Sequence, residues 1–193
     1  MENSTITAIN GVTVGHVTDV QNATGVTVVR FAGEGATAAG SGQGAAPGTR
    51  ETDLLDPGNL VDKVHAIVLT GGSAYGLDAA SGVMASLEAQ GQGLEVMPGV
   101  VVPIVPAAVL FDLSIGSPSV RPNADWGKEA VTTASSQPVQ SGNIGAGTGA
   151  TVGKLGGPAF VTKGGLGSAV TVLPNGTRVA ALVAVNAVGE IVD

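Results

Sequence analysis

The fold is decided by one stretch, Ala66-Ile67-Val68-Leu69-Thr70-Gly71-Gly72-Ser73. Its first five residues form an unbroken apolar run, which is typical of a strand buried on both faces. The two glycines and the serine lead into residues 74–90, whose many small side chains predict a helix that packs very closely on a sheet or on a second helix. The rest of the chain is layered around this strand and helix.

Strands and helices alternate on both sides of this unit. Residues 6–17 predict a short strand, a turn at Asn10-Gly11 and a second strand, and residues 25–31 predict a β-branched strand. Asn175-Gly176 predicts a hairpin that pairs residues 168–173 with 178–185. The other expected elements are a turn at Asp56-Pro57-Gly58, helices at 59–64 and 125–135, an apolar stretch at 100–113 and a last strand at 190–193. Residues 33–47 fit either a closely packed strand or a mobile loop.

This alternation of helices with antiparallel strands predicts an α+β layered fold, and the length fits one domain, 1–193. The hairpin carries small or apolar residues on both faces, so we expect it to be sandwiched. Only 12% of the residues are charged, compared with about 25% in an average soluble chain. No apolar run reaches the roughly 18 residues that a bilayer span requires. We therefore expect an oligomer or a partner segment to cover part of the surface.

Composition excludes several classes of function. The net charge is −7 and Lys and Arg do not cluster, which argues against nucleic-acid binding. There is no cysteine, and His16 and His65 have no metal-ligand spacing, so neither a metal site nor a cofactor is expected. Residues 1–4 lack a basic and then apolar signal region, which favours a cytoplasmic protein.

The segment 142–154 holds five glycines and ends in Lys154, the only charged residue between Glu129 and Lys163. It is either a flexible surface loop with a solvated lysine or a backbone-lined pocket into which Lys154 points. A phosphate-binding loop is excluded, because Thr148 stands where the first glycine belongs and Leu155 replaces the required hydroxyl. A dinucleotide fingerprint at 145–150 is excluded as well, since no buried strand precedes it.

Four motifs occur in order along the chain: 71–78, 102–112, 145–154 and 185–189. Together they resemble the L-aminopeptidase/D-esterase family of self-cleaving hydrolases, which includes the nylon-oligomer hydrolases. The resemblance implies a four-layer αββα sandwich similar to the N-terminal-nucleophile hydrolases. It also implies a precursor that cuts itself into α and β subunits, with a Ser or Thr as the first residue of β. This chain resembles the α subunit, whose sheet the β subunit would complete.

The same resemblance assigns roles to residues of this chain. Asn186 matches the position whose side-chain amide donates to the oxyanion, and Lys154 matches the lysine that holds polar groups around the nucleophile. Phe111 stands where relatives often have tyrosine, and phenylalanine cannot donate to an oxyanion. Without the resemblance, Asn186 would be interpreted as a turn residue at a strand end.

Backbone groups are candidates for the substrate or oxyanion region as well. Gly72 and Ser73 end a strand and begin a helix, where free N–H groups attract a carboxylate or a carbonyl oxygen, although a tight turn would need the same residues. Gly147 and Gly149 belong to the same region through the glycine-rich loop. Tyr75, His16 and His65 are expected to be structural residues.

We therefore expect an amide-bond hydrolase, either an aminopeptidase for short peptides or a hydrolase of 6-aminohexanoate oligomers. It would act without a cofactor, together with a β subunit, as a homo-oligomer of αβ units. One alternative is an acyltransferase similar to the ornithine acetyltransferases. The other is a catalytically silent assembly subunit, which the phenylalanine at position 111 would permit.

Overall fold

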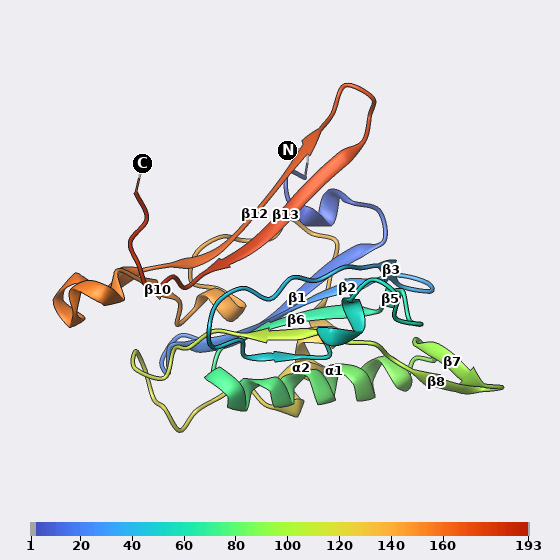
Figure 1. Cartoon of the computed structure of the whole chain (residues 1–193), viewed down its shortest axis with the longest axis horizontal. Helices are drawn as coiled ribbons and strands as arrows, with labels where there is room; N and C mark the ends of the chain where they lie inside the picture. Colours follow the sequence, from blue (N-terminus) through green and yellow to red (C-terminus); the bar gives the residue numbers. More distant parts are fainter. Residues whose placement is uncertain (1–2, 193) are drawn as a thin grey trace.

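The computed structural model describes residues 3–192, and a five-stranded mixed sheet lies at its centre (Figure 1). The strand order is β1-β2-β6-β9-β4, and all neighbours are antiparallel except β6 and β9, which are parallel. The bounds are β1 Val12–Asp19, β2 Thr24–Phe31, β4 Thr49–Arg50, β6 Ala66–Thr70 and β9 Ala107–Val109. The strands predicted at 25–31 and 66–70 are confirmed.

Two helices cover one face of this sheet (Figure 1): α1, Ala79–Glu88, and α2, Ala124–Thr133. They touch closely because glycines stand at the crossing. A Cβ atom on Gly82 would lie 1.7 Å from the carbonyl oxygen of Ala124, and one on Gly127 would lie 2.0 Å from that of Ala79. Val26, Val28 and Val68 of the sheet pack beneath the helices in one fully buried cluster.

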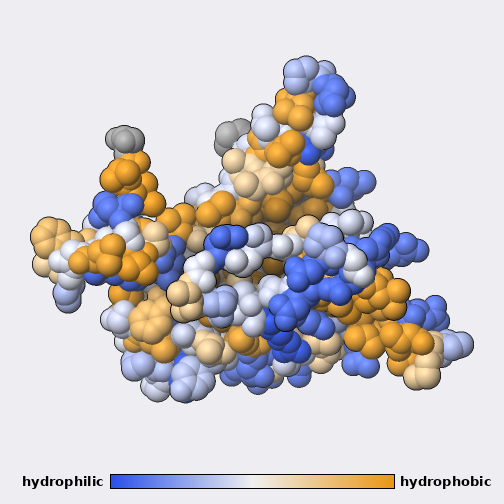
Figure 2. Space-filling model, viewed as in Figure 1, coloured by the Kyte–Doolittle hydropathy of each residue, from blue (hydrophilic) through white to orange (hydrophobic). Residues whose placement is uncertain are grey.

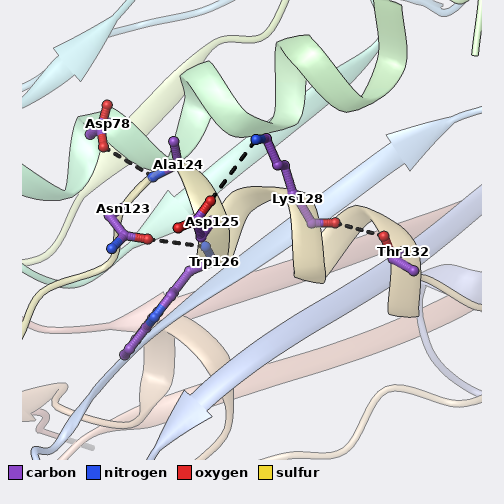
Figure 3. A network of polar contacts seen from close by, with 7 residues as sticks. All are labelled: Asp78, Asn123, Ala124, Asp125, Trp126, Lys128 and Thr132. Carbon is purple, nitrogen blue, oxygen red and sulfur yellow. Dashed lines mark hydrogen bonds and ion pairs between the residues drawn. The ribbon is translucent and has the colours of Figure 1, made fainter. Parts of the chain in front are cut away.

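The start of α2 is fixed by side-chain caps (Figure 3). The Asn123 side chain accepts a hydrogen bond from the Trp126 N–H (3.2 Å), and the Asp78 carboxylate accepts one from the Ala124 N–H (3.0 Å). These caps satisfy donors that have no partner inside the helix. The helix predicted at 125–135 is confirmed to within two residues. The helix predicted at 74–90 is α-helical only from Ala79, because the chain first forms the 3₁₀ turn η3, Ser73–Asp78.

The opposite face of the sheet contacts a hairpin, β12 Gly165–Val172 and β13 Arg178–Val185. At the base of the hairpin, Leu166, Leu182 and Ala184 pack on Val12, Val14 and Val29 of the sheet. The tip projects away from the other elements (Figure 1), and apolar side chains are visible along it (Figure 2). The predicted hairpin is confirmed. The expectation that it is sandwiched holds only for its base within the described residues.

Short pairs of strands complete the described structure: β3 Ala36–Thr37 with β5 Lys63–Val64, β7 Leu94–Met97 with β8 Val100–Val102, and β10 Thr151–Val152 with β11 Thr162–Lys163. The remaining 3₁₀ turns are η1 Ile6–Ala8, η2 Asp53–Leu55, η4 Gly145–Gly147, η5 Lys154–Gly156 and η6 Pro158–Phe160. Within residues 3–192, no helix has the length and apolarity to cross a membrane.

Three local predictions were wrong. Residues 6–8 form η1 instead of a strand, because the Ile6 N–H and the Thr7 hydroxyl bond to Ser168 and to the Gln137 carbonyl. Residues 59–64 form no helix, since Lys63 and Val64 pair with β3. Residues 190–192 form no strand, and Asp193 lies outside the described residues. Residues 33–47 are irregular apart from β3.

Candidate active site

Four segments that are far apart in the sequence meet where β9 and β13 end. Asn186 directly follows β13. Its side-chain Nδ2 donates to the carbonyl oxygen of Phe111 (3.1 Å), a residue that lies shortly after the end of β9. Its Oδ1 accepts from the Thr151 N–H (3.0 Å), in the glycine-rich loop. The turn Gly71–Ser73 joins this corner through Asp112, which accepts from the Gly72 N–H (2.7 Å). The four quoted motifs therefore form one three-dimensional cluster.

Lys154 lies at the centre of this cluster. Its Nζ donates to Asn186 Oδ1 (3.0 Å) and to the carbonyl oxygens of Thr151 (2.5 Å), Asn186 (3.1 Å) and Ala187 (3.1 Å). These acceptors are all neutral, and no carboxylate pairs with this ammonium among residues 3–192. Burial lowers the pKa of Lys154. The lysine is therefore not a freely solvated side chain of a surface loop, because its ammonium is bonded to backbone carbonyls and to Asn186. A pocket into which Lys154 points stays a prediction.

The side-chain amide of Asn186 has a fixed orientation as a result. Its oxygen accepts two hydrogen bonds, from Lys154 Nζ and from the Thr151 N–H. Its nitrogen therefore points away from these donors, toward the Phe111 carbonyl. An NH₂ group has two hydrogens, and the Phe111 carbonyl takes one of them. The other has no partner among the described residues and can donate to a ligand.

The glycines of the loop are required by close packing. Residues 145–150 are all buried. A Cβ on Gly147 would lie 2.3 Å from the Leu166 nitrogen, and one on Gly149 would lie 2.0 Å from the Ala23 carbonyl oxygen. The loop is also bound to the sheet, because the Thr27 hydroxyl on β2 accepts a hydrogen bond from the Ala146 N–H (3.0 Å). A role for Gly147 and Gly149 in substrate binding stays a prediction.

Gly72 and Ser73 form a tight turn whose donors are already used. Both residues have positive φ angles, +81° and +54°. The Gly72 N–H donates to Asp112, and the Ser73 N–H donates to the Leu110 carbonyl (3.0 Å). This favours the turn over the ligand-binding interpretation of these two residues.

Two charged residues of this corner were missed in the sequence. Asp112 is only 3% exposed and accepts from the Thr24 hydroxyl (2.7 Å) as well as from Gly72. Lys163 donates to the carbonyl oxygens of Thr148 (2.7 Å) and Ala150 (2.9 Å). Two features of the sequence could have identified them. Asp112 directly follows Phe111, and Lys163 ends a long segment, from residue 130, in which Lys154 is the only other charged residue. Beside them, the buried Thr151 hydroxyl has no hydrogen-bond partner within the described part of the chain.

Both histidines are built into the fold. The Thr27 hydroxyl accepts from Ala146 and lies 2.9 Å from His16 Nδ1, and burial lowers the pKa of His16 to about 4. His65 Nδ1 accepts from the Ile104 N–H (3.0 Å), and burial lowers the pKa of His65 as well. Tyr75 is exposed, with the Arg121 guanidinium 3.8 Å from its ring centroid. These contacts fit the structural roles expected for all three.

An apolar groove of about 450 Å³ leads to Asn186 between the sheet and the hairpin. Its other lining residues are Leu69, Ala108, Val109, Leu110, Leu182, Val183 and Ala184. A larger cavity, about 820 Å³, lies near β5 and β7 and contains neither Lys154 nor Asn186. The larger cavity therefore does not coincide with the cluster of the four motifs. Within residues 3–192, no three His, Asp or Glu side chains gather in a way that could hold a metal ion.

Comparison with known proteins places this cluster in a family. A model of peptidase family S58 matches residues 4–192. The chain belongs to peptidase family S58. The S58 chain is 45% identical over 205 residues to an uncharacterised aminopeptidase of Mycobacterium leprae (strain TN), covering 98% of this chain and 54% of that protein. It is 34% identical over 184 residues to a 6-aminohexanoate-oligomer endohydrolase of Kocuria sp. (strain KY2), covering 95% of this chain and 48% of that protein. The chain thus spans about half the length of the curated relatives it matches.

Solved structures identify the fold. The S58 chain matches the L-aminopeptidase D-Ala-esterase/amidase of Ochrobactrum anthropi, a variant of the N-terminal-nucleophile hydrolase fold, with a TM-score of 0.72 and 21% identity. That match covers 95% of this chain and 53% of the other. A β-aminopeptidase of Burkholderia sp. gives a TM-score of 0.70 and 22% identity, over 96% and 52% of the two chains. The predicted α+β class and the likeness to N-terminal-nucleophile hydrolases are confirmed, whereas completion by a separate β subunit stays a prediction.

Proposed function

We propose that this S58 chain is the α part of an amide-bond hydrolase in which it supplies the oxyanion donor and its support. The observation that carries the proposal is the contact between Lys154 Nζ and Asn186 Oδ1 (3.0 Å), which turns the amide nitrogen outward. The attacking Ser or Thr hydroxyl would come from a β part of the same precursor, freed by autoproteolysis. The activities named for the relatives support an aminopeptidase or a 6-aminohexanoate-oligomer hydrolase as the activity.

The proposed chemistry combines a nucleophile of the β part with the donor of this chain. A free N-terminal amine on the β part, with a pKa near 8, takes the proton from its own hydroxyl, and the oxygen attacks the amide carbonyl. Negative charge develops on the carbonyl oxygen, and the free N–H of Asn186 is the donor placed to meet it. The positive charge of Lys154 on Asn186 Oδ1 polarises the amide and strengthens that donor. Such a preorganised donor contributes about 3 to 4 kcal/mol to transition-state stabilisation.

Phe111 contributes its backbone rather than its side chain. Its carbonyl oxygen accepts from Asn186, whereas the residue is 52% exposed and its ring has no donor to offer an oxyanion. The stabilisation therefore rests on Asn186 and on backbone amides. We expect this to affect the rate or the range of substrates, not the class of reaction.

The exposed hairpin supports a partner for this chain. Large apolar side chains remain open along it, and the groove beside Asn186 is apolar as well. A β part that packs here would bury this surface and bring its nucleophile to Asn186. Assembly of several αβ units and a cytoplasmic location belong to the same proposal.

The test uses the full-length protein. Mass spectrometry is expected to show two fragments, the smaller beginning with Ser or Thr. Asn186→Ala is expected to lower kcat by about 10²- to 10³-fold, the cost of losing an oxyanion donor. Lys154→Met is expected to lower kcat as well, because the Asn186 amide loses the ammonium that orients and polarises it. The matched control is Lys128→Met, whose ammonium makes only an exposed ion pair with Asp125 on α2.

Aminoacyl p-nitroanilides, 6-aminohexanoate oligomers and acetylornithine separate the candidate reactions. Transfer of the acetyl group from acetylornithine to an acceptor amine, without hydrolysis of the other two, would replace the hydrolase by an acyltransferase. A single uncut polypeptide without activity would favour the silent assembly subunit. Unchanged rates in Asn186→Ala would remove this residue from the mechanism.

A further inference from the structure

Lys163 holds the glycine-rich loop through the backbone carbonyls of that loop. It lies on β11, paired with Thr151 of β10, and its Nζ donates to the carbonyl oxygens of Thr148 (2.7 Å) and Ala150 (2.9 Å). The Gly147 carbonyl lies at 3.5 Å from the same ammonium. Asp112 packs against the same loop, since a Cβ on Gly149 would lie 2.6 Å from the Asp112 Cβ. The loop therefore lies against two charged residues, and Lys163 is the one that bonds to its backbone carbonyls.

One peptide unit links Lys163 to the candidate active site. The Ala150 carbonyl that accepts from Lys163 belongs to the same peptide group as the Thr151 N–H, which donates to Asn186 Oδ1 (3.0 Å). A cation on the oxygen of a peptide group polarises its N–H and makes it a better donor. The amide oxygen of Asn186 is thus bound directly by Lys154 and indirectly by Lys163.

We propose that Lys163 is a positioning residue that fixes the Ala150–Thr151 peptide, and through it the amide of Asn186, for the reaction. Lys163 touches neither Asn186 nor the groove, so it does not act on the substrate itself. Burial lowers the pKa of Lys163, and the nearby Asp112 carboxylate opposes this by raising it. The reaction in this inference rests on the proposed function, whereas the link from Lys163 to Asn186 does not.

The experiment compares Lys163→Met, Lys163→Arg and the control Lys128→Met in the full-length protein. The first readout is independent of activity: NMR of the Thr151 amide and of the Asn186 side-chain NH₂. In Lys163→Met we expect hydrogen exchange at Thr151 to be about tenfold faster, the effect of losing one charge-assisted hydrogen bond. We also expect the Asn186 NH₂ signals to move, whereas both probes stay unchanged in Lys128→Met.

The second readout is kinetic. Lys163→Met is expected to lower kcat about tenfold on an aminoacyl p-nitroanilide with KM within about twofold, and Lys163→Arg is expected to recover part of the loss by keeping the charge. If Lys163→Met does not fold, Lys163→Gln is measured in its place, because glutamine removes the charge but keeps a side-chain NH₂ group that can donate.

The outcomes separate the two proposals. Unchanged Thr151 exchange and Asn186 signals in a folded variant without the lysine overturn the positioning role. Loss of kcat with unchanged NMR probes overturns it too, because the effect would then travel by another route. A wild-type protein that hydrolyses no amide refutes the proposed function, while the NMR probes still decide the link between Lys163 and Asn186.

Discussion

The two faces of the central sheet differ in how completely they are covered. On the helix face, Val26, Val28 and Val68 are fully buried, and glycines bring α1 and α2 into backbone contact. On the hairpin face, only the base of β12 and β13 packs, and the outer side chains of Val179 and Val183 are 50% and 51% exposed. The helix face is a finished core, whereas on the other face the hairpin keeps an apolar outer surface that nothing covers among the described residues.

The second face also carries the polar chemistry. His16 and Thr27 lie on it beneath the glycine-rich loop, and Asn186 follows the strand that borders it. On the helix face, residues of the sheet and of both helices form one buried apolar cluster. The candidate site therefore lies on the side of the sheet away from the helices.

The largest effect is expected from placing the same side chain on each face. Gly82→Val would drive a branched side chain into the Ala124 carbonyl, and we expect it to cost at least about 3 kcal/mol and to prevent folding. Gly167→Val is its counterpart on the hairpin, where nothing lies within 4 Å of the new Cβ. Circular dichroism and thermal unfolding should show a folded Gly167→Val protein beside an unfolded Gly82→Val protein. Equal stability of the two would contradict the difference between the faces.

A smaller effect is expected from acid, because the hairpin face contains the partly buried His16. Its pKa is about 4 in the folded protein and near 6.5 when unfolded, so between these values only the unfolded state binds the proton. Stability is therefore lost as the pH falls from 6.5 to 4, by up to about 3 kcal/mol at about 1.4 kcal/mol per pKa unit. Urea unfolding at pH 7 and pH 4.5 measures this loss.

The control for this effect is His16→Gln, which cannot titrate. It should lose less stability over the same interval, with the remaining loss attributed in part to His65, whose pKa burial also lowers. An identical pH dependence in wild type and His16→Gln would show that the histidine beneath the loop is not coupled to folding.

The sequence predicted the parts that local patterns determine. The buried strand at 66–70, the β-branched strand at 25–31 and the Asn-Gly hairpin follow from side-chain periodicity and turn chemistry, and the structure has them all. The helix predicted for Lys63 and Val64 was wrong, because these residues pair with Ala36 and Thr37, which are distant in the sequence. No local pattern reveals such a partner.

The candidate site divides in the same way. Lys154 and Asn186 were predicted through the resemblance, and the structure brings them together, although their roles stay predictions. Lys163 was missed because a lone lysine between a threonine and two glycines has no distinctive pattern. Its meaning comes only from the carbonyl groups that the folded loop turns toward it.

The smallest effect on the stability of this chain is expected at the outer face of the hairpin. Val179 and Val183 lie two strand repeats apart, so their side chains share one face, opposite to the face of Leu182 and Ala184 that packs on the sheet, although Val183 also borders the groove beside Asn186. In the described chain both side chains are half exposed, and Val→Asp there should change the free energy of unfolding by no more than about 0.5 kcal/mol. If the proposed β part covers this face, the same aspartate becomes a buried, unpaired charge, which costs several kcal/mol.

Gel filtration of processed Val179→Asp and Val183→Asp protein should then show the two fragments separating. The control is Val20→Asp, at an exposed valine in the turn between β1 and β2, which should leave the fragments together. Fragments that co-elute in all three variants would mean that the outer face stays in water, and the partner would have to bind elsewhere on the chain.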